Sequence, residues 1–245
     1  MIHDKLSRFL EFCVTQLFPG PFDFEEYLAS LGFRYVVGID EVGVGAFFGP
    51  ILAAAVVFDL RSKKTLRGLL SRLKDSKQLS EKKREEFFTE VCNHAVLVGL
   101  GEVGVDEIGE IQNNVRCAFL ARSRALHEVL GKVRQLPAVA LIDHFFIPDC
   151  PISQLGITRG DEHVVTIAAA SIVAKVVRDR WIRCLVSVRP ELSKYDLCNN
   201  KGYRSKKHWS AVKRFGPTRF HRLHMRELRQ LVKDEREKSS FGPVS

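Results

Sequence analysis

Four acidic residues stand where predicted core elements end, and their side chains are the first candidates for chemistry in this chain. They are Asp40, Glu41, Asp143 and Asp161. The first two follow an apolar strand predicted over 35–39, the third follows one predicted over 138–142, and the fourth precedes an apolar helix predicted over 164–188. Ordinary alternatives remain, because adjacent acids often form a solvated turn and an Asp before a helix can cap it.

Carboxylates gathered in this way favour a hard divalent cation such as Mg²⁺, which prefers anionic oxygen ligands. Two such ions, roughly 3.5 to 4 Å apart, would activate a water and stabilise the leaving oxygen of an in-line phosphoryl displacement. Mutual repulsion opposes leaving several carboxylates together without a cation. A clustered set therefore predicts bound metal or raised pKa values.

The charge of the chain indicates a polyanionic partner, with nucleic acid as the first candidate. The chain has 38 Lys and Arg against 29 Asp and Glu, a formal net charge of +9. Residues 201–236 contain 12 basic and 3 acidic residues, so this stretch accounts for the whole excess. A solvated helical surface explains some of these charges but not the interleaved aromatic residues, which are Tyr203, Trp209, Phe215 and Phe220.

The elements that must position these residues alternate between strand and helix. Besides those already named, the pattern predicts a strand over 51–58, a helix over 80–95, a strand over 96–103 and a helix over 106–130 that only Gly109 interrupts. This order indicates an α/β fold built in layers. Apolar residues make up 45% of the chain, enough for a sizeable core.

Several protein classes are disfavoured by composition. The six cysteines are scattered without a C-x-x-C pair, which predicts neither a zinc site nor a dense disulfide framework. No run of about 18 uncharged apolar residues occurs, and charges interrupt the first residues. We therefore expect a cytoplasmic protein that makes no membrane contact.

Residues 38–50 read GIDEVGVGAFFGP and resemble the G-x-D-E-x-G-R-G-x-x-x-G-P signature of the type 2 ribonucleases H, the ribonuclease HII family. The resemblance extends over about residues 34–224 in family order. Its further segments are DSKQLS at 75–80, LID at 141–143, GD at 160–161, IAAASIVAKV at 167–176, GY at 202–203, GPT at 216–218 and HR at 221–222.

The resemblance implies a ribonuclease-H-like fold, with a central mixed sheet flanked by helices and a helical C-terminal region. It also implies hydrolysis of the RNA strand of RNA/DNA hybrids and of ribonucleotides embedded in duplex DNA, on the 5′ side of the ribonucleotide. The matching catalytic and metal-binding acids, for Mg²⁺ or Mn²⁺, are Asp40, Glu41, Asp143 and Asp161. We expect three parts: an N-terminal helical extension over 1–33, a catalytic domain over 34–200 and a basic, mainly helical substrate-binding region over 201–245.

Nucleic-acid contacts are expected from two sources. In the family, the backbone of the glycine motif senses the ribose 2′-hydroxyl and a tyrosine stacks on the neighbouring deoxyribose. The matching residues here are Gly43, Val44, Gly45 and Tyr203. Phosphate contacts are expected from Lys206 and Lys207 in the basic stretch, and from Lys77 and Lys175 on the family match alone. We expect a monomer, and the sequence indicates no protein partner.

One departure from the signature bears on substrate choice. Val44 replaces the Arg between the two glycines, and with the FFGP ending of the motif this also resembles ribonuclease HIII, which prefers long hybrids. Asp161 argues against ribonuclease HIII, because that sister type is expected to have a Glu at this position. The roughly 33 residues before the match are too few for a platform domain, since even marginal domains need more than about 40. A hybrid-binding module with a decayed active site is a third alternative, which the complete set of four acids disfavours.

Overall fold

The computed structural model describes residues 14, 16–18, 20, 22–70, 73, 79–133 and 136–240. The chain divides into two units, each made of three stretches and each with its own buried core. The first unit comprises the residues up to 42, 52–102 and 118–177, and the second comprises 43–51, 103–117 and 178 onward.

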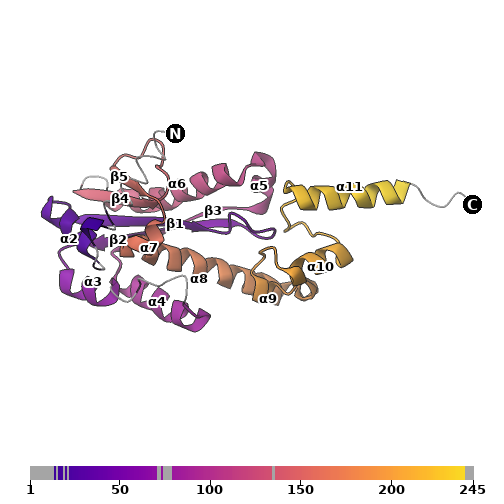
Figure 1. The fold of residues 1–245 in the computed structure, drawn as a ribbon, viewed down its shortest axis with the longest axis horizontal. Coiled ribbons are helices and arrows are strands. Elements are labelled where there is room, and N and C mark those ends of the chain that lie inside the picture. Colours follow the sequence, from indigo (N-terminus) through magenta and orange to yellow (C-terminus); the bar gives the residue numbers. More distant parts are fainter. Residues whose placement is uncertain are drawn as a thin grey trace, which may run out of the picture. The chain divides into compact units, whose positions relative to one another are not determined.

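A five-stranded mixed sheet forms the centre of the first unit (Figure 1). Its strands are β1 (Tyr35–Val42), β2 (Ile51–Asp59), β3 (Leu97–Val103), β4 (Ala138–Asp143) and β5 (Ser153–Ile157). Their order is β3-β2-β1-β4-β5, and β1 runs antiparallel to β2 but parallel to β4, which is parallel to β5. The inner strands β1, β2 and β4 are buried along almost their whole length, which explains their continuous apolar runs.

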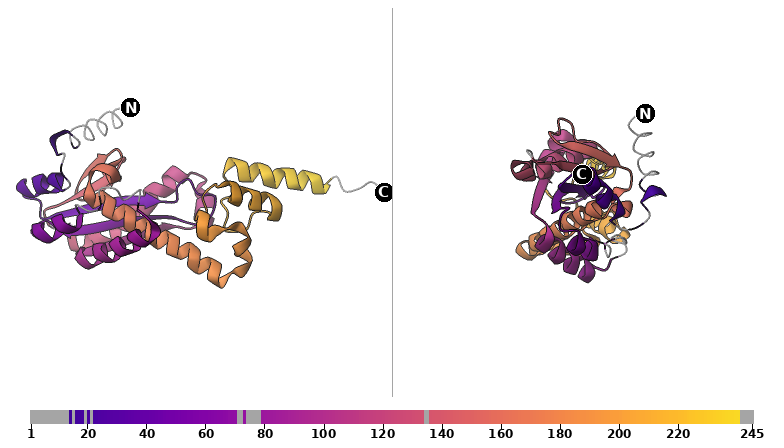
Figure 2. Two further views of the ribbon diagram at one scale, coloured as in Figure 1. Left: turned by 60° about the horizontal axis from the view of Figure 1, so that its bottom comes forward. Right: turned by 90° about the vertical axis from the view of Figure 1, so that its left-hand side faces the viewer.

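Helices cover both faces of this sheet (Figure 2). They are α2 (Asp23–Ser30), α3 (Lys63–Leu70), α4 (Glu81–His94), α6 (Asn114–Val133), α7 (Gly160–His163) and the first half of α8 (Val165–Val188). A Cβ atom added at Gly38 of β1 would lie 2.0 Å from the carbonyl oxygen of Thr166 in α8. One added at Gly101 of β3 would lie 1.9 Å from that of Ala121 in α6. Glycine therefore lets both helices approach the sheet closely, and the expected mixed sheet flanked by helices is confirmed.

Helix α2 packs into the core of the first unit. Phe24 and Leu28 belong to that core, and the buried carboxylate of Glu25 accepts hydrogen bonds from the N–H and hydroxyl of Thr166, at 3.0 and 2.6 Å. Burial raises the pKa of Glu25 above its ordinary value. Residues 1–13 of the expected N-terminal extension lie outside the described residues, and the division at 33 and 200 stays a prediction.

The second unit is mostly helical. It contains the C-terminal half of α8, α5 (Val105–Ile111), the 3₁₀ helix η3 (Pro190–Tyr195), α9 (Leu197–Asn200), α10 (Lys206–Phe215) and α11 (Arg226–Ser240). Its core includes Phe47, Phe48, Tyr195 and Leu228. The predicted helical C-terminal region is confirmed. No helix among the described residues has both the length and the apolar character needed to cross a membrane.

Two predicted elements differ from the structure. The strand predicted to end before Asp40 continues to Val42, because its pairing with β2 continues through these residues. The helix predicted over 106–130 is two helices, α5 and α6, which separate at Gln112, where φ is +52°. Asn113 starts the second helix, since its side-chain oxygen accepts from the N–H groups of Val115 and Arg116.

Candidate active site

Asp40 and Glu41 are consecutive residues of β1, so their side chains point to opposite faces of the sheet. Asp40 is buried and hydrogen-bonded to Ser171 of α8 on one face. Glu41 points to the other face, where Arg122 of α6 donates to its carboxylate through Nε and Nη2. Only 4% of the Arg122 side chain and 13% of the Glu41 side chain are exposed. The two acids of the motif therefore have different partners.

Parallel pairing of β1 with β4 brings Asp143 beside Asp40, because the residues just before these two acids are paired across the strands. Asp161 comes from α7, directly after Gly160, whose N–H donates to Asp143 Oδ1 at 2.7 Å. Asp40 and Asp161 are both buried. Three acids that are far apart in the sequence are thus gathered where β1, β4 and α7 meet.

Burial and mutual repulsion raise the pKa values of two of these carboxylates. Burial, followed by the charges of Glu41 and Asp143, raises the pKa of Asp40 well above its ordinary value, although Ser171 opposes this by a hydrogen bond. Burial, followed by the charge of Asp161, raises the pKa of Asp143 to about 6. The site accumulates negative charge that a bound cation would stabilise.

The chemistry of this donor set fits a hard divalent cation, because every candidate ligand is a carboxylate. Among the described residues, however, no three His, Cys, Asp or Glu side chains are arranged so that they could hold a metal ion. Oxygens of these acids accept hydrogen bonds within the chain: Asp40 Oδ1 accepts from the N–H of Glu41 at 2.8 Å, and Glu41 accepts from Arg122. A metal site made by all four acids stays a prediction, and forming it involves rearranging these side chains.

The glycine motif, here residues 43–50, belongs to the second unit. The buried side chain of Arg222 donates hydrogen bonds to its backbone. Nε of Arg222 donates to the carbonyl oxygen of Gly49 at 2.9 Å. Nη1 donates to those of Gly43 at 2.7 Å and Val44 at 3.1 Å. Burial, followed by the charge of Arg178, lowers the pKa of Arg222 to about 9, so that the guanidinium is charged at neutral pH.

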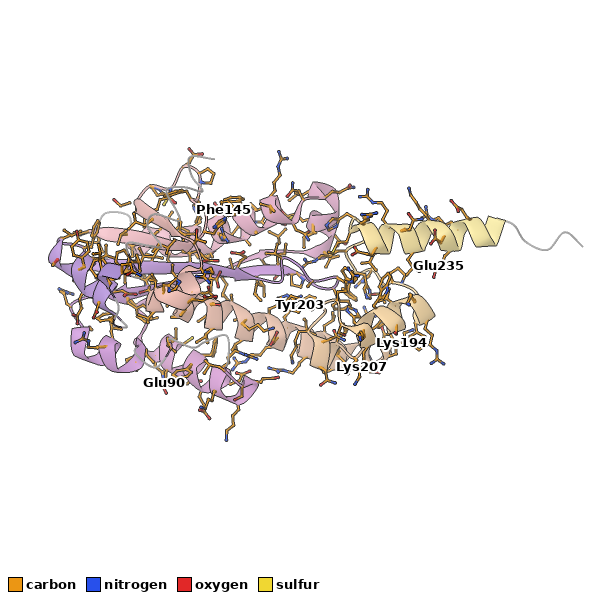
Figure 3. The ribbon with its side chains drawn as sticks, in the orientation of Figure 1. Glu90, Phe145, Lys194, Tyr203, Lys207 and Glu235 are labelled. Carbon is orange, nitrogen blue, oxygen red and sulfur yellow. The ribbon has the colours of Figure 1, made fainter. Side chains whose placement is uncertain are left out.

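Arg178 of α8 fixes the other end of the same loop and is fully buried. Its guanidinium donates to the carbonyl oxygens of Pro50 at 3.0 Å, Phe48 at 2.8 Å and Lys201 at 2.9 Å. Its Cζ lies 5.3 Å from the ring centroid of Tyr203, the half-buried tyrosine labelled in Figure 3. One arginine therefore contacts both the glycine motif and the predicted stacking tyrosine.

The GY segment at 202–203 is also joined to the glycine motif through the backbone. The N–H of Phe47 donates to the carbonyl oxygen of Gly202 at 2.9 Å. Gly202 has a φ of +78°, and a Cβ there would lie 2.8 Å from the carbonyl oxygen of Phe48. Glycine is required at this position by both conformation and space. The structure thus brings together two motifs that are far apart in the sequence.

The carbonyl group of Val44 is hydrogen-bonded to other residues of the chain. Its carbonyl oxygen accepts from Asn114 Nδ2 at 2.7 Å as well as from Arg222. The N–H groups of Val44 and Gly45 donate to no acceptor in the part of the chain that the structure describes. These two N–H groups are therefore among the backbone donors of the motif that remain for a ligand.

The four predicted phosphate-binding lysines lie in different parts of the chain. Lys206 and Lys207, the second of which is labelled in Figure 3, are exposed in the first turn of α10. Ser205 caps this helix by accepting from an N–H of that turn at 3.0 Å. Lys175 is half-buried in the part of α8 that belongs to the first unit. Lys77 lies outside the described residues. Their contacts with nucleic acid stay predictions.

Sequence reasoning named none of three buried arginines, Arg122, Arg178 and Arg222, as a site residue, although Arg222 lies in the HR segment of the family match. A signal existed for the first two, because each interrupts an apolar helix face. Arg122 lies at helical spacing between the buried residues Ala118 and Ala125. An arginine that is buried needs partners, so such a position indicates a structural or functional ion pair or carbonyl contact.

Two solved structures share this fold. Ribonuclease H2 from Pyrococcus horikoshii OT3 superposes with a TM-score of 0.65 at 23% identity, covering 83% of this chain and 99% of that one. Bst-RNase HIII, solved in complex with Mn²⁺, gives a TM-score of 0.68 at 19% identity, covering 86% and 73%. The fold is therefore that of the ribonuclease-H-like proteins.

Sequence comparison defines the family within that fold. The family model for ribonuclease HII matches residues 37–228. Ribonuclease HII of Caldanaerobacter subterraneus subsp. tengcongensis is 38% identical over 199 residues, which cover 81% of this chain and 77% of the relative. This chain belongs to the ribonuclease HII family. It is accordingly a type 2 ribonuclease H, a hydrolase that acts on RNA/DNA hybrids.

Proposed function

We propose that this chain is an endonuclease that cuts both the RNA strand of RNA/DNA hybrids and ribonucleotides embedded in duplex DNA, on the 5′ side of a ribonucleotide. Asp40, Glu41, Asp143 and Asp161 are its metal-binding and catalytic acids, with Mg²⁺ or Mn²⁺ as the cofactor. Two bound cations would supply activation of the attacking water and stabilisation of the leaving oxygen.

The observation that carries this proposal is the gathering of carboxylates in which burial, followed by the charges of neighbouring acids, raises the pKa values of Asp40 and Asp143. A structural role alone does not account for them, because buried carboxylates that repel one another destabilise the fold. Metal-binding acids require such an arrangement. The parallel register of β1 and β4 and the bond from Gly160 to Asp143 support a shared site for three of the proposed ligands.

Residues of the second unit bind and select the substrate in this proposal. The N–H groups of Val44 and Gly45 donate to a ribose 2′-hydroxyl, which distinguishes RNA from DNA. Tyr203 stacks on the neighbouring deoxyribose, and Arg178 orients its ring from 5.3 Å. Lys206 and Lys207 contact phosphates without reading sequence.

Cleavage assays on two duplexes test the proposal. One duplex carries a single ribonucleotide in DNA and the other a long RNA tract paired with DNA, each with Mg²⁺ or Mn²⁺. We expect metal-dependent products with 3′-hydroxyl and 5′-phosphate ends. Asp40→Asn should lower turnover by orders of magnitude while duplex binding persists, because the substitution removes a metal-holding charge rather than a duplex contact.

The matched control for that variant is Asp234→Asn, which changes an exposed Asp of α11 in the same chemical way. The control should cleave like the wild type. Binding of either duplex without cleavage under any metal condition would replace the proposal with the hybrid-binding module. Cleavage of the tract alone would instead favour a preference for long hybrids like that of ribonuclease HIII. This is the second candidate function, because residue 44 is Val and not Arg.

A further inference from the structure

A pocket of about 710 Å³ lies within the second unit and is lined by residues of α5, of the segment 219–224 and of α11. Its basic lining residues are Arg219, Arg222, Arg229 and Lys233. Two carboxylates, Asp106 and Glu110, also line it, so the positive charges outnumber the negative ones. Arg219, Arg229 and Lys233 are exposed, whereas Arg222 is 1% exposed.

Two residues that line this pocket each have a buried polar atom without a hydrogen-bond partner. In the described part of the chain, these atoms are Nη2 of Arg222 and Nδ1 of His224. Buried polar atoms nearly always have a partner, because an unpaired one destabilises the protein. A guanidinium N–H can only donate a hydrogen bond. Both unpaired atoms belong to residues that line the pocket, and the net positive lining favours an anionic ligand.

The remaining polar atoms of both residues are bound to the glycine motif, directly or through one amide. Arg222 Nη1 donates to the carbonyl oxygens of Gly43 and Val44. His224 Nε2 lies 2.9 Å from Asn114 Oδ1, and Asn114 Nδ2 donates to the carbonyl oxygen of Val44. The Asn114 amide thus fixes the proton of a neutral His224 ring on Nε2, which leaves Nδ1 as an acceptor. Arg222 and His224 are therefore both connected to the carbonyl oxygen of Val44, the first directly and the second through Asn114.

We propose that this pocket binds a phosphate group and that its occupancy is linked to the glycine motif. Phosphate oxygens accept from Arg222 Nη2 and from the exposed cations, an arrangement that suits a tetrahedral anion with several acceptors. A phosphate that carries a hydroxyl also donates to Nδ1 of neutral His224. Because Arg222 donates to the phosphate and to the carbonyl oxygens of Gly43 and Val44 at once, binding restrains the glycine motif.

Two sources of phosphate share this chemistry. One is inorganic phosphate or a phosphate monoester, and the other is a phosphodiester of a nucleic-acid strand bound elsewhere on the chain. The second source rests on the proposed function, whereas binding of phosphate itself does not. A phosphodiester has no hydroxyl on phosphorus, so it leaves Nδ1 of neutral His224 without a donor.

Titration with inorganic phosphate at constant ionic strength, with chloride as the reference anion, tests the pocket on the full chain. Calorimetry should show one saturable site, and the amide resonances of Gly43 and Gly45 should move in proportion to its occupancy. Arg229→Ala with Lys233→Ala should weaken phosphate binding by about tenfold or more, because each loses a charge-assisted contact. Arg219→Ala is an independent variant for which we expect a loss in the same direction.

The matched control is Lys213→Ala with Arg214→Ala, which removes one lysine and one arginine that are exposed on α10 of the same unit and do not line the pocket. It should keep phosphate affinity within about twofold of the wild type. The proposal is wrong if phosphate shows no saturable binding, or if the control pair weakens it as much as the pocket pair. It is equally wrong if saturation leaves the glycine amides unmoved.

Competition decides the source of the phosphate. An all-DNA duplex, which offers no ribonucleotide to cut, should displace phosphate if a strand phosphodiester occupies the pocket. Adenosine monophosphate should displace it, with the duplex having no effect, if a monoester does. None of these measurements needs catalysis, so failure of phosphate binding and failure of the proposed nuclease activity are separate results.

Discussion

The carboxylate cluster should make the metal-free protein less stable at neutral pH, and Asp143→Asn should relieve this. Asn keeps an oxygen that can accept the hydrogen bond from the N–H of Gly160 but carries no charge to repel Asp161. The variant therefore removes the unfavourable charge with little change in shape. We expect it to be more stable than the wild type in the presence of a metal chelator, and we expect it to be inactive if Asp143 binds the catalytic metal.

The size of the effect follows from the pKa of Asp143. Its pKa rises from an ordinary 3.8 to about 6 in the folded chain. Because the folded state binds the proton more tightly, the free energy of unfolding falls as pH rises from the unfolded to the folded pKa. The fall amounts to about 3 kcal/mol and is complete above roughly pH 7. Asp143→Asn should lack this fall.

Urea unfolding between pH 4 and 8, with and without chelator, measures the difference. The wild type and Asp143→Asn should have similar stability near pH 4 and diverge by up to about 3 kcal/mol near pH 7.5. Adding Mg²⁺ should stabilise the wild type and narrow the gap. Asp234→Asn, an exposed control, should follow the wild type. If Asp143→Asn is no more stable than the wild type in chelator at pH 7.5, burial and the charge of Asp161 do not destabilise an ionised Asp143, and the reasoning is wrong.

Further predictions concern binding, substrate choice and the α2 contact. Replacing Lys206 and Lys207 with Ala should reduce the slope of log affinity for duplex against log salt by up to about two, and an unchanged slope would assign them to solvated surface. Val44→Arg should raise the specificity constant for a single embedded ribonucleotide, relative to a long tract, by about ten- to a hundredfold. The reason is that a charge-assisted contact contributes roughly 1.5 to 3 kcal/mol. Equal changes on both substrates would contradict this prediction. Glu25→Gln should keep the hydrogen bonds from Thr166 while removing a buried acid with a raised pKa. Its free energy of unfolding should therefore decline less than that of the wild type as pH rises above about 4.5, and parallel pH curves would count against the reasoning.

Much of the fold was predictable because its signals are local. Continuous apolar runs marked β1, β2 and β4, and the apolar stretch over 164–188 marked α8 within one residue of its observed start. The motif residues were also visible in the sequence, since GIDEVGVGAFFGP is contiguous. The split between α5 and α6 was missed, although Asn113 is a favoured residue at a helix start.

The sequence by itself determined the family, four of the five strands, and which acids are candidates for metal binding, because these depend on residue identity and short-range pattern. Only the tertiary structure showed that Asp40 and Glu41 face opposite sides of the sheet, with Arg122 beside Glu41. It alone showed that Arg178 and Arg222 hold the glycine motif, through hydrogen bonds between residues more than a hundred positions apart. Such pairings depend on how distant segments pack, and no local pattern encodes which carbonyl group a buried guanidinium will reach.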